Sequence, residues 1–322
     1  MDAVKTLPIK KQTKLIQRLP ETRLSNQLDR KNAGWIVFST YLSPQLFEDI
    51  DFHTQTYNSV LDVWSVGHYE VALMSGELTN EHEKVLKASK IDYASLSDVP
   101  DLTQPGLIVF DMDSTAIQIE CIDEIAKLAG VGEQVSEVTE RAMQGELDFE
   151  QSLRQRVLAL KGADEDILEQ VRATLPFMPD LRELISSLQG FGWKTAIASG
   201  GFTYFSDYLK QELKLDHAQS NTLEIIDGKL TGAVIGEVVS AQTKADILQQ
   251  LAEKYGVTQQ NTVAVGDGAN DLVMMEVAGL GIAYHAKPKV EQQAQTSVRF
   301  AGLGGVMCIL SGLLAKHRKI SF

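Results

Sequence analysis

The sequence contains little cysteine and no long apolar segment. Only two of its 322 residues are cysteine, Cys121 and Cys308, which excludes a disulfide scaffold and a four-cysteine zinc site. No apolar run reaches the roughly 18 residues of a membrane span. The polar N-terminus lacks the apolar segment of a secretory signal. We therefore expect a cytoplasmic protein that does not bind membranes.

Positive charge is also scarce. The chain has 30 Lys and Arg against 43 Asp and Glu, so its formal net charge is −13. An acidic protein repels nucleic acid unless it carries a local basic patch, and the basic stretches here are short. We therefore expect no nucleic-acid partner. Hydrophobic residues make up 44% of the chain, which predicts a folded protein, and the length is sufficient for two domains.

The first part of the chain has an α+β pattern. Residues 1 to about 33 are polar and predict a loosely ordered lead-in. Residues 34–96 then predict the order strand, helix, strand, strand, helix, strand, which is the split pattern of a ferredoxin-like fold. Two prolines and a glycine in 98–106 predict a linker. We therefore expect an N-terminal domain over 1–104 and a second domain over 105–322.

The second part alternates between strands and helices. Four short apolar runs predict strands that are buried on both faces; they are residues 107–110, 194–198, 262–265 and 280–283. Helical patterns between them predict a doubly wound parallel sheet. The helical stretch between the first two strands is longer than one crossover requires. It predicts an inserted helical cap at about 119–183.

Polar clusters follow three of these strands, where open α/β sheets bind ligands. The clusters are DMDST at 111–115, SGG at 199–201 and GDGAND at 266–271. Asp111 and Asp113 face the same side if the chain stays extended, and two such carboxylates can hold Mg²⁺ or act as nucleophile and general acid. Each cluster alone also fits an ordinary capped turn. Together, however, their carboxylates would repel one another without a cation.

The order of these motifs, with Lys244 between the second and the third, resembles the haloacid dehalogenase superfamily. ECIDEIAKLAG at 120–130, GELDFEQSLRQRV at 145–157 and AYHAKP at 283–288 are similar to segments of the phosphoserine phosphatases within it. The resemblance covers about 106–310. It implies a superfamily-like core with a helical cap, preceded by an ACT-like domain for regulation or oligomerisation, through which two copies could pair.

The resemblance also implies an activity: Mg²⁺-dependent hydrolysis of O-phospho-L-serine to L-serine and phosphate through an aspartyl phosphate, the last step of serine biosynthesis. It makes Asp111 the nucleophile and Asp113 the general acid/base. The implied metal ligands are Asp111, the Asp113 backbone carbonyl and Asp267, with Asp271 orienting Lys244 or a metal-bound water. The residues implied to bind substrate are Glu120, Met143, Phe149, Arg156, Ser199, Gly200, Lys244 and Asn270.

Several alternatives stay open on the sequence. Spacing does not decide whether Arg154 or Arg156 faces the substrate. Another small phosphorylated metabolite could replace phosphoserine, and a phosphomutase would share the chemistry. A signalling domain that accepts a phosphoryl group also uses an Asp, a hydroxyl and a Lys on such a sheet. Asp113 and the long cap argue against that domain, since a general acid/base speeds loss of the phosphoryl group.

Overall fold

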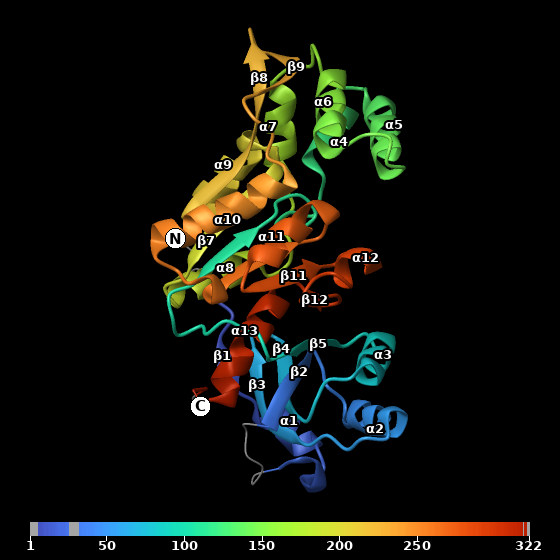
Figure 1. Ribbon diagram of the computed structural model, residues 1–322, viewed down its shortest axis with the longest axis vertical. Coiled ribbons are helices and arrows are strands. Elements are labelled where there is room, and N and C mark those ends of the chain that lie inside the picture. Colours follow the sequence, from blue (N-terminus) through green and yellow to red (C-terminus); the bar gives the residue numbers. More distant parts are fainter. Residues whose placement is uncertain (1–5, 26–31, 318, 321–322) are drawn as a thin grey trace.

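The computed structural model describes residues 6–25, 32–317 and 319–320. Figure 1 shows three tiers along the long axis. A helical cap lies at the top, a mostly parallel sheet with helices in the middle, and an antiparallel sheet at the bottom. Within the described ranges, no helix combines the length and the apolar character needed to cross a membrane.

The antiparallel sheet is built from the first part of the chain, in the order β1-β3-β4-β2-β5. Its strands are β1 Ile9–Lys11, β2 Ala33–Ser39, β3 Val60–Val66, β4 Tyr69–Ser75 and β5 Asp92–Ser95. Helices α2 Pro44–Thr54 and α3 Asn80–Ala88 complete the predicted strand–helix order, which is confirmed. The ACT-like assignment stays a prediction.

The lead-in is more ordered than expected. It forms β1, which pairs with β3, and helix α1 Thr13–Arg18. Leu15 of α1 is fully buried and belongs to the apolar cluster on the α2 side of the sheet. The polar composition concealed this segment, because only a few buried leucines, such as Leu15 and Leu19, anchor the short helix. The predicted lead-in residues 1–5 and 26–31 lie outside the described residues.

The other face of the antiparallel sheet is covered by α13 Gly304–Lys316, the last helix of the chain. Residues 304–312 of this helix are all buried. The indole N–H of Trp64 on β3 donates to the Ser311 hydroxyl at 2.8 Å. A helix from the predicted second domain therefore packs against the first. The division into domains 1–104 and 105–322 stays a prediction.

The middle tier is the predicted doubly wound sheet, in the order β12-β11-β10-β6-β7-β8-β9. Its strands are β6 Leu107–Phe110, β7 Lys194–Phe202, β8 His217–Ile226, β9 Lys229–Ile235, β10 Thr262–Gly266, β11 Leu280–Tyr284 and β12 Thr296–Val298. Its helices are α8 Leu181–Gly190, α9 Thr203–Leu213, α10 Ala241–Tyr255, α11 Leu272–Val277 and α12 Pro288–Glu291. All four apolar runs are strands. Among the described strand pairs of this sheet, β8 and β9 are antiparallel and the others are parallel.

The cap consists of α4 Cys121–Leu128, α5 Gly132–Met143, α6 Phe149–Ala159 and α7 Asp166–Ala173. Two linkers join it to the sheet and pair with each other, since the Gln118 N–H donates to the Pro176 carbonyl at 3.0 Å. The β8–β9 hairpin holds the cap at a second point. There the Leu230 N–H donates to the Ala163 carbonyl at 2.9 Å. The cap is thus attached beside the carboxyl ends of the strands.

The antiparallel sheet also contacts the foot of the cap. Tyr69 of β4 donates its hydroxyl hydrogen to a carboxylate oxygen of Asp180 at 2.6 Å, and accepts from the Gly302 N–H at 2.9 Å. Asp180 directly precedes α8, at the end of the returning cap linker, and has a positive φ of 66°. The first part of the chain therefore touches the segment that carries the cap.

Candidate active site

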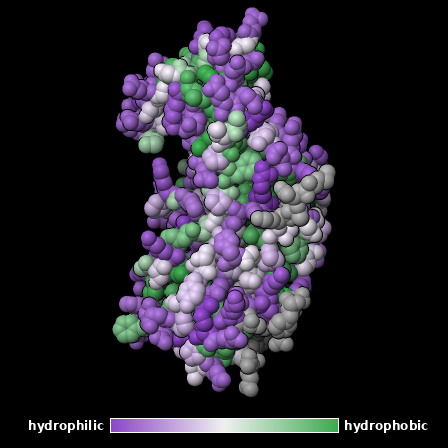
Figure 2. Space-filling model, turned by 180° about the vertical axis from the view of Figure 1, so that it is seen from behind, coloured by the Kyte–Doolittle hydropathy of each residue, from purple (hydrophilic) through white to green (hydrophobic). Residues whose placement is uncertain are grey.

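The topology brings the three predicted polar clusters together. Strand β6 lies between β7 and β10, so the residues at the carboxyl ends of these three strands meet at one edge of the sheet. They border a cavity of about 280 Å³ under the cap, and Figure 2 shows a recess between the cap and the rest of the molecule. The cavity is lined by Asp111, Asp113, Glu120, Ile122, Phe149, Leu153, Arg156, Ser199, Gly200, Gly201, Phe202, Asp267, Gly268, Ala269 and Asn270.

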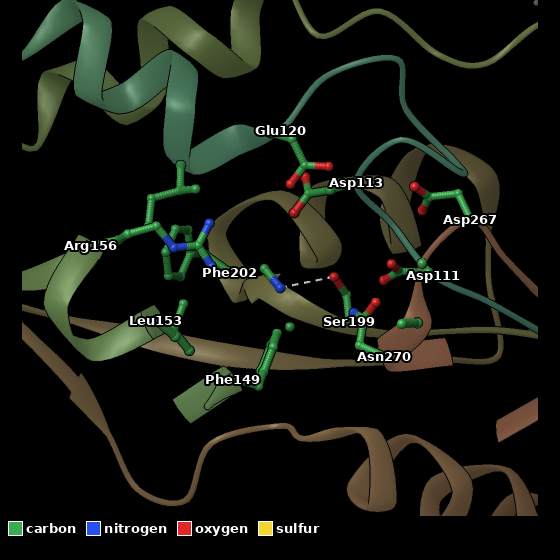
Figure 3. Close-up of a pocket in the computed structure, with 15 residues that line it drawn as sticks. Asp111, Asp113, Glu120, Phe149, Leu153, Arg156, Ser199, Phe202, Asp267 and Asn270 are labelled. Carbon is green, nitrogen blue, oxygen red and sulfur yellow. Dashed lines mark hydrogen bonds between the residues drawn. The ribbon is translucent and has the colours of Figure 1, made fainter. Parts of the chain in front are cut away.

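Asp111 and Asp113 both face this cavity, as expected for alternate residues after a strand (Figure 3). One oxygen of Asp111 accepts from the Met112 N–H at 2.7 Å, and one oxygen of Asp113 accepts from the Cys121 N–H at 3.2 Å. Burial, followed by the charges of Glu120 and Asp111, raises the pKa of Asp113 to about 8. The Asp113 carboxyl can therefore hold a proton near neutral pH and give it up during a reaction.

Gly201 allows this arrangement because it has no side chain. A Cβ at position 201 would lie 2.6 Å from a carboxylate oxygen of Asp113. The Gly201 N–H donates to the Ser199 hydroxyl oxygen at 2.9 Å, and Ser199 is 1% exposed. The SGG sequence therefore forms a close-packed, irregular loop within the end of β7, in which the hydroxyl of Ser199 is held in one orientation.

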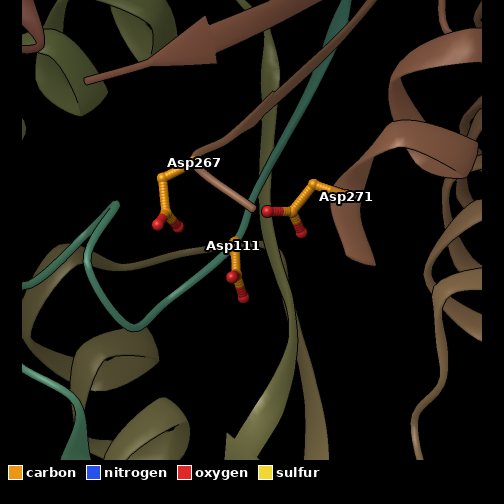
Figure 4. Close-up of side chains that lie close together, drawn as sticks. All are labelled: Asp111, Asp267 and Asp271. Carbon is orange, nitrogen blue, oxygen red and sulfur yellow. The ribbon is translucent and has the colours of Figure 1, made fainter. Parts of the chain in front are cut away.

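Three carboxylates gather beside the acid pair and could hold a metal ion. One oxygen each from Asp111, Asp267 and Asp271 lies within 4.8 Å of the others, and Figure 4 shows the three side chains close together. Burial, then the charge of Asp111, raises the pKa of Asp267 to about 7 and that of Asp271 to about 6. A cation would offset this repulsion, and an all-oxygen donor set suits a hard cation such as Mg²⁺.

Lys244 lies under the carboxylates and is fully buried. Its ammonium nitrogen is 2.8 Å from an oxygen of Asp111 and 2.7 Å from an oxygen of Asp271. Burial alone would lower the pKa of Lys244, but the two negative charges raise it above its ordinary value. Lys244 is therefore a permanently charged part of the site, and Asp271, which also accepts from the Gly268 N–H at 3.0 Å, holds it in place.

The cap contributes one negative and one positive group. Glu120 accepts a hydrogen bond from the Ser114 hydroxyl at 2.7 Å, and burial raises the pKa of its carboxyl. Arg156 lines the cavity, and its buried Nε has no hydrogen-bond partner among the described residues. Arg154 instead pairs with Glu150 at 2.8 Å on the exposed side of α6. The structure thus selects Arg156 as the inward arginine, as Figure 3 also shows.

Most of the predicted site residues border the cavity, with three exceptions. Lys244 and Asp271 lie beneath it, and Met143, at the end of α5, is 70% exposed and does not line it. Sequence reasoning missed Leu153, although it lies four residues after Phe149 and three before Arg156, on the same face of a helix. Ile122 and Phe202 were also missed, because the sequence does not distinguish an apolar residue that lines a ligand cavity from one that packs in the core.

Comparisons with known proteins agree with this geometry. Residues 105–279 match the model of the haloacid dehalogenase-like hydrolases, and residues 31–95 match a domain of unknown function. The chain is 72% identical to the phosphoserine phosphatase of Vibrio cholerae, over 100% of this chain and 98% of that relative.

Solved structures give the same result. The unliganded crystal structure of a probable phosphoserine phosphatase from Vibrio cholerae has a TM-score of 0.93 at 72% identity, and the match covers 100% of this chain and 99% of that one. A phospho-aspartyl intermediate analogue of phosphoserine phosphatase has a TM-score of 0.60 at 42% identity. That match covers 63% of this chain and 98% of that one.

Proposed function

The chain belongs to the haloacid dehalogenase-like hydrolases and, within them, to the phosphoserine phosphatases, and we propose that its cavity beneath the cap is the site of that reaction. The enzyme hydrolyses O-phospho-L-serine to L-serine and phosphate. One observation carries the assignment of the cavity. An acid pair with a bound lysine lies on its sheet side, and Glu120 and Arg156 line it from the cap, the Nε of Arg156 having no hydrogen-bond partner among the described residues.

The proposed reaction uses the two aspartates in succession. A carboxylate oxygen of Asp111 attacks phosphorus, the bond from phosphorus to the seryl oxygen breaks, and Asp113 gives its proton to that oxygen. L-serine leaves, and Asp111 carries the phosphoryl group. Asp113, now a base, removes a proton from water as the water oxygen attacks phosphorus. Phosphate then leaves and Asp111 is regenerated. The raised pKa of Asp113 supports this double role.

Charge must be neutralised before a carboxylate can approach a phosphate. Lys244 supplies one positive charge beneath Asp111. Asp111, the Asp113 backbone carbonyl and Asp267 would hold Mg²⁺, which would supply further positive charge and align the phosphoryl group. Asp267 keeps its orientation through the Thr115 hydroxyl, which donates to it at 3.2 Å.

The phosphoryl oxygens require donors around them. In our proposal Ser199, Gly200, Lys244 and Asn270 provide these, and three of the four line the cavity. Phe149 of the cap lies directly over this loop, because a Cβ on Gly200 would be 2.6 Å from its ring. Phe149 would therefore exclude water from the reacting atoms, and Met143 would join it only if α5 moves inward.

Substrate choice is proposed to come from Glu120 and Arg156. Phosphoserine carries an ammonium and a carboxylate besides its phosphate. The Glu120 carboxylate suits the ammonium, and the planar Arg156 guanidinium suits the carboxylate. A phosphorylated alcohol without these charges would leave both groups unpaired, so it should be a poorer substrate.

We further propose that the reaction is the last step of a route to serine, takes place in the cytoplasm, and occurs in a homodimer that pairs through the antiparallel sheet domain. Phe52 in the last turn of α2 and Tyr57 in the segment that follows it are 70% and 56% exposed, which supports an interface there. Light scattering of the wild type and of Phe52→Asp tests the dimer. An equal mass for both proteins would refute this interface.

The function is tested by phosphate release from O-phospho-L-serine with and without Mg²⁺, beside phosphothreonine, phosphoethanolamine and p-nitrophenyl phosphate. We expect Mg²⁺-dependent release that is fastest with phosphoserine. Faster turnover of another ester would indicate a different small phosphorylated metabolite. A phosphoenzyme that is stable for minutes would favour a signalling domain, and transfer to a second hydroxyl would indicate a phosphomutase.

A further inference from the structure

Asn221 of β8 joins two segments of the active site without lining the cavity. It is 2% exposed. Its side-chain N–H donates to the Gly200 carbonyl at 2.8 Å, and its side-chain oxygen accepts from the Val239 N–H at 2.8 Å. We propose that Asn221 is a positioning residue that sets the Ser199–Gly200 loop and Lys244 at the spacing a phosphoryl group requires. This inference rests on the proposed function of those residues.

The side-chain N–H of Asn221 binds the Gly200 carbonyl, which has no partner in the β7–β8 ladder. Ala198 pairs with Gln219 across β7 and β8, and the next pair is Phe202 with Asn221. The segment 199–201 therefore bulges out of the ladder, opposite a single residue of β8. A half-buried carbonyl in such a bulge loses its ladder partner and is stabilised by another donor. The Asn221 amide is that donor, and it binds the Gly200 carbonyl. Gly200 lies between Ser199 and Gly201, whose N–H holds the Ser199 hydroxyl.

The side-chain oxygen of Asn221 binds the backbone just before α10. Val239, which is 3% exposed, directly precedes Ser240. Ser240 caps the helix by accepting from the Thr243 N–H, and its carbonyl accepts from the Lys244 N–H at 3.0 Å. Asn221 therefore holds the residue from which the first turn of α10, with Lys244, is built. The Asn221 amide thus links the segment that carries the Ser199 hydroxyl to the helix that carries the Lys244 ammonium.

The conservative change Asn221→Asp tests this role. Aspartate has nearly the same shape and keeps an oxygen for the Val239 N–H, but it places a second oxygen against the Gly200 carbonyl. The loop must then move away. Because misplacement of about 1 Å can cost on the order of 100-fold in rate, we expect kcat/KM for phosphoserine to fall roughly tenfold to 100-fold. The inhibition constant of inorganic phosphate should rise in parallel, because the distance between Ser199 and Lys244 would no longer match the size of the phosphate.

The chain contains a matched control in Asn261. This asparagine is also buried, at 7% exposure, and bridges backbone groups: it accepts from the Asp101 N–H at 2.8 Å and donates to the Pro105 carbonyl at 2.9 Å. It directly precedes β10, at the opposite end of that strand from Asp267. Asn261→Asp should therefore lower the melting temperature while leaving phosphate inhibition unchanged.

The experiment measures kcat, KM, phosphate inhibition and melting temperature for the full-length wild type, Asn221→Asp, Asn221→Ala and Asn261→Asp. We expect weaker phosphate inhibition only in the two Asn221 variants. Inhibition and kcat within twofold of wild type in a folded Asn221 variant would overturn the proposal. So would failure of both Asn221 variants to fold, since the role would then be structural. If the wild type does not hydrolyse phosphoserine, the proposed function fails instead, and calorimetric phosphate binding still decides the role of Asn221.

Discussion

Replacing Arg156 by leucine should change which esters the enzyme prefers. Within the described part of the chain the buried Arg156 Nε has no hydrogen-bond partner, and a substrate carboxylate in the cavity could accept from it. Loss of one partner of a buried, charged hydrogen bond costs about 2–5 kcal/mol, which is roughly 30-fold to several thousand-fold in kcat/KM. Phosphoethanolamine, which lacks the carboxylate, should lose much less.

The control for this prediction lies two residues away on the same helix. Arg154 pairs with Glu150 and is 46% exposed on its side chain, so Arg154→Leu should leave both substrates within about twofold, because exposed ion pairs contribute little. The assay is kcat/KM for phosphoserine and phosphoethanolamine in the wild type and both variants. Equal losses for the two substrates in Arg156→Leu would refute the carboxylate contact and make the residue structural.

Three further predictions concern the loop, the sheet interface and the metal. Gly201→Ala should lower kcat at least tenfold, because the new Cβ would meet Asp113 at 2.6 Å. The control Gly190→Ala, with open space around it, should leave kcat unchanged. Equal kcat values for the two variants would contradict this prediction. Trp64→Ala should lower the free energy of unfolding in urea by about 3–5 kcal/mol. Leu158→Ala should cost little because Leu158 is 58% exposed, and a similar cost for both would show that α13 packs weakly. Ca²⁺ should inhibit in competition with Mg²⁺, because the larger ion tends to bind both oxygens of a carboxylate and would occupy the attacking one; comparable turnover with Ca²⁺ alone would exclude a metal-bound nucleophile.

The sequence predicted the core of the fold because its signals are local. An apolar run such as 107–110, followed at once by aspartates, indicates both a buried strand and its functional end. Parallel pairing then brings such ends together. The choice between Arg154 and Arg156 was not predicted from the sequence, because it depends on how α6 packs over the sheet, which only the structure shows.

Other features depend on packing between distant segments. A lone Lys244 gives no sign that it is fully buried between two carboxylates, because its environment comes from how α10 lies on the sheet. The apolar helix α13 indicates burial but not which surface covers it, and it covers the antiparallel sheet. Asn221 carries no motif, and its role follows only from a bulge in the neighbouring strand.

The central claim is that Asp111 carries the phosphoryl group during turnover. The direct test is to mix the enzyme with phosphoserine and Mg²⁺, quench with acid within milliseconds, digest, and locate the phosphate by mass spectrometry. We expect a hydroxylamine-sensitive acyl phosphate on Asp111, formed as fast as serine is released and absent from Asp111→Asn. Phosphate found on Ser199 instead, or full activity in Asp111→Asn, would contradict the account.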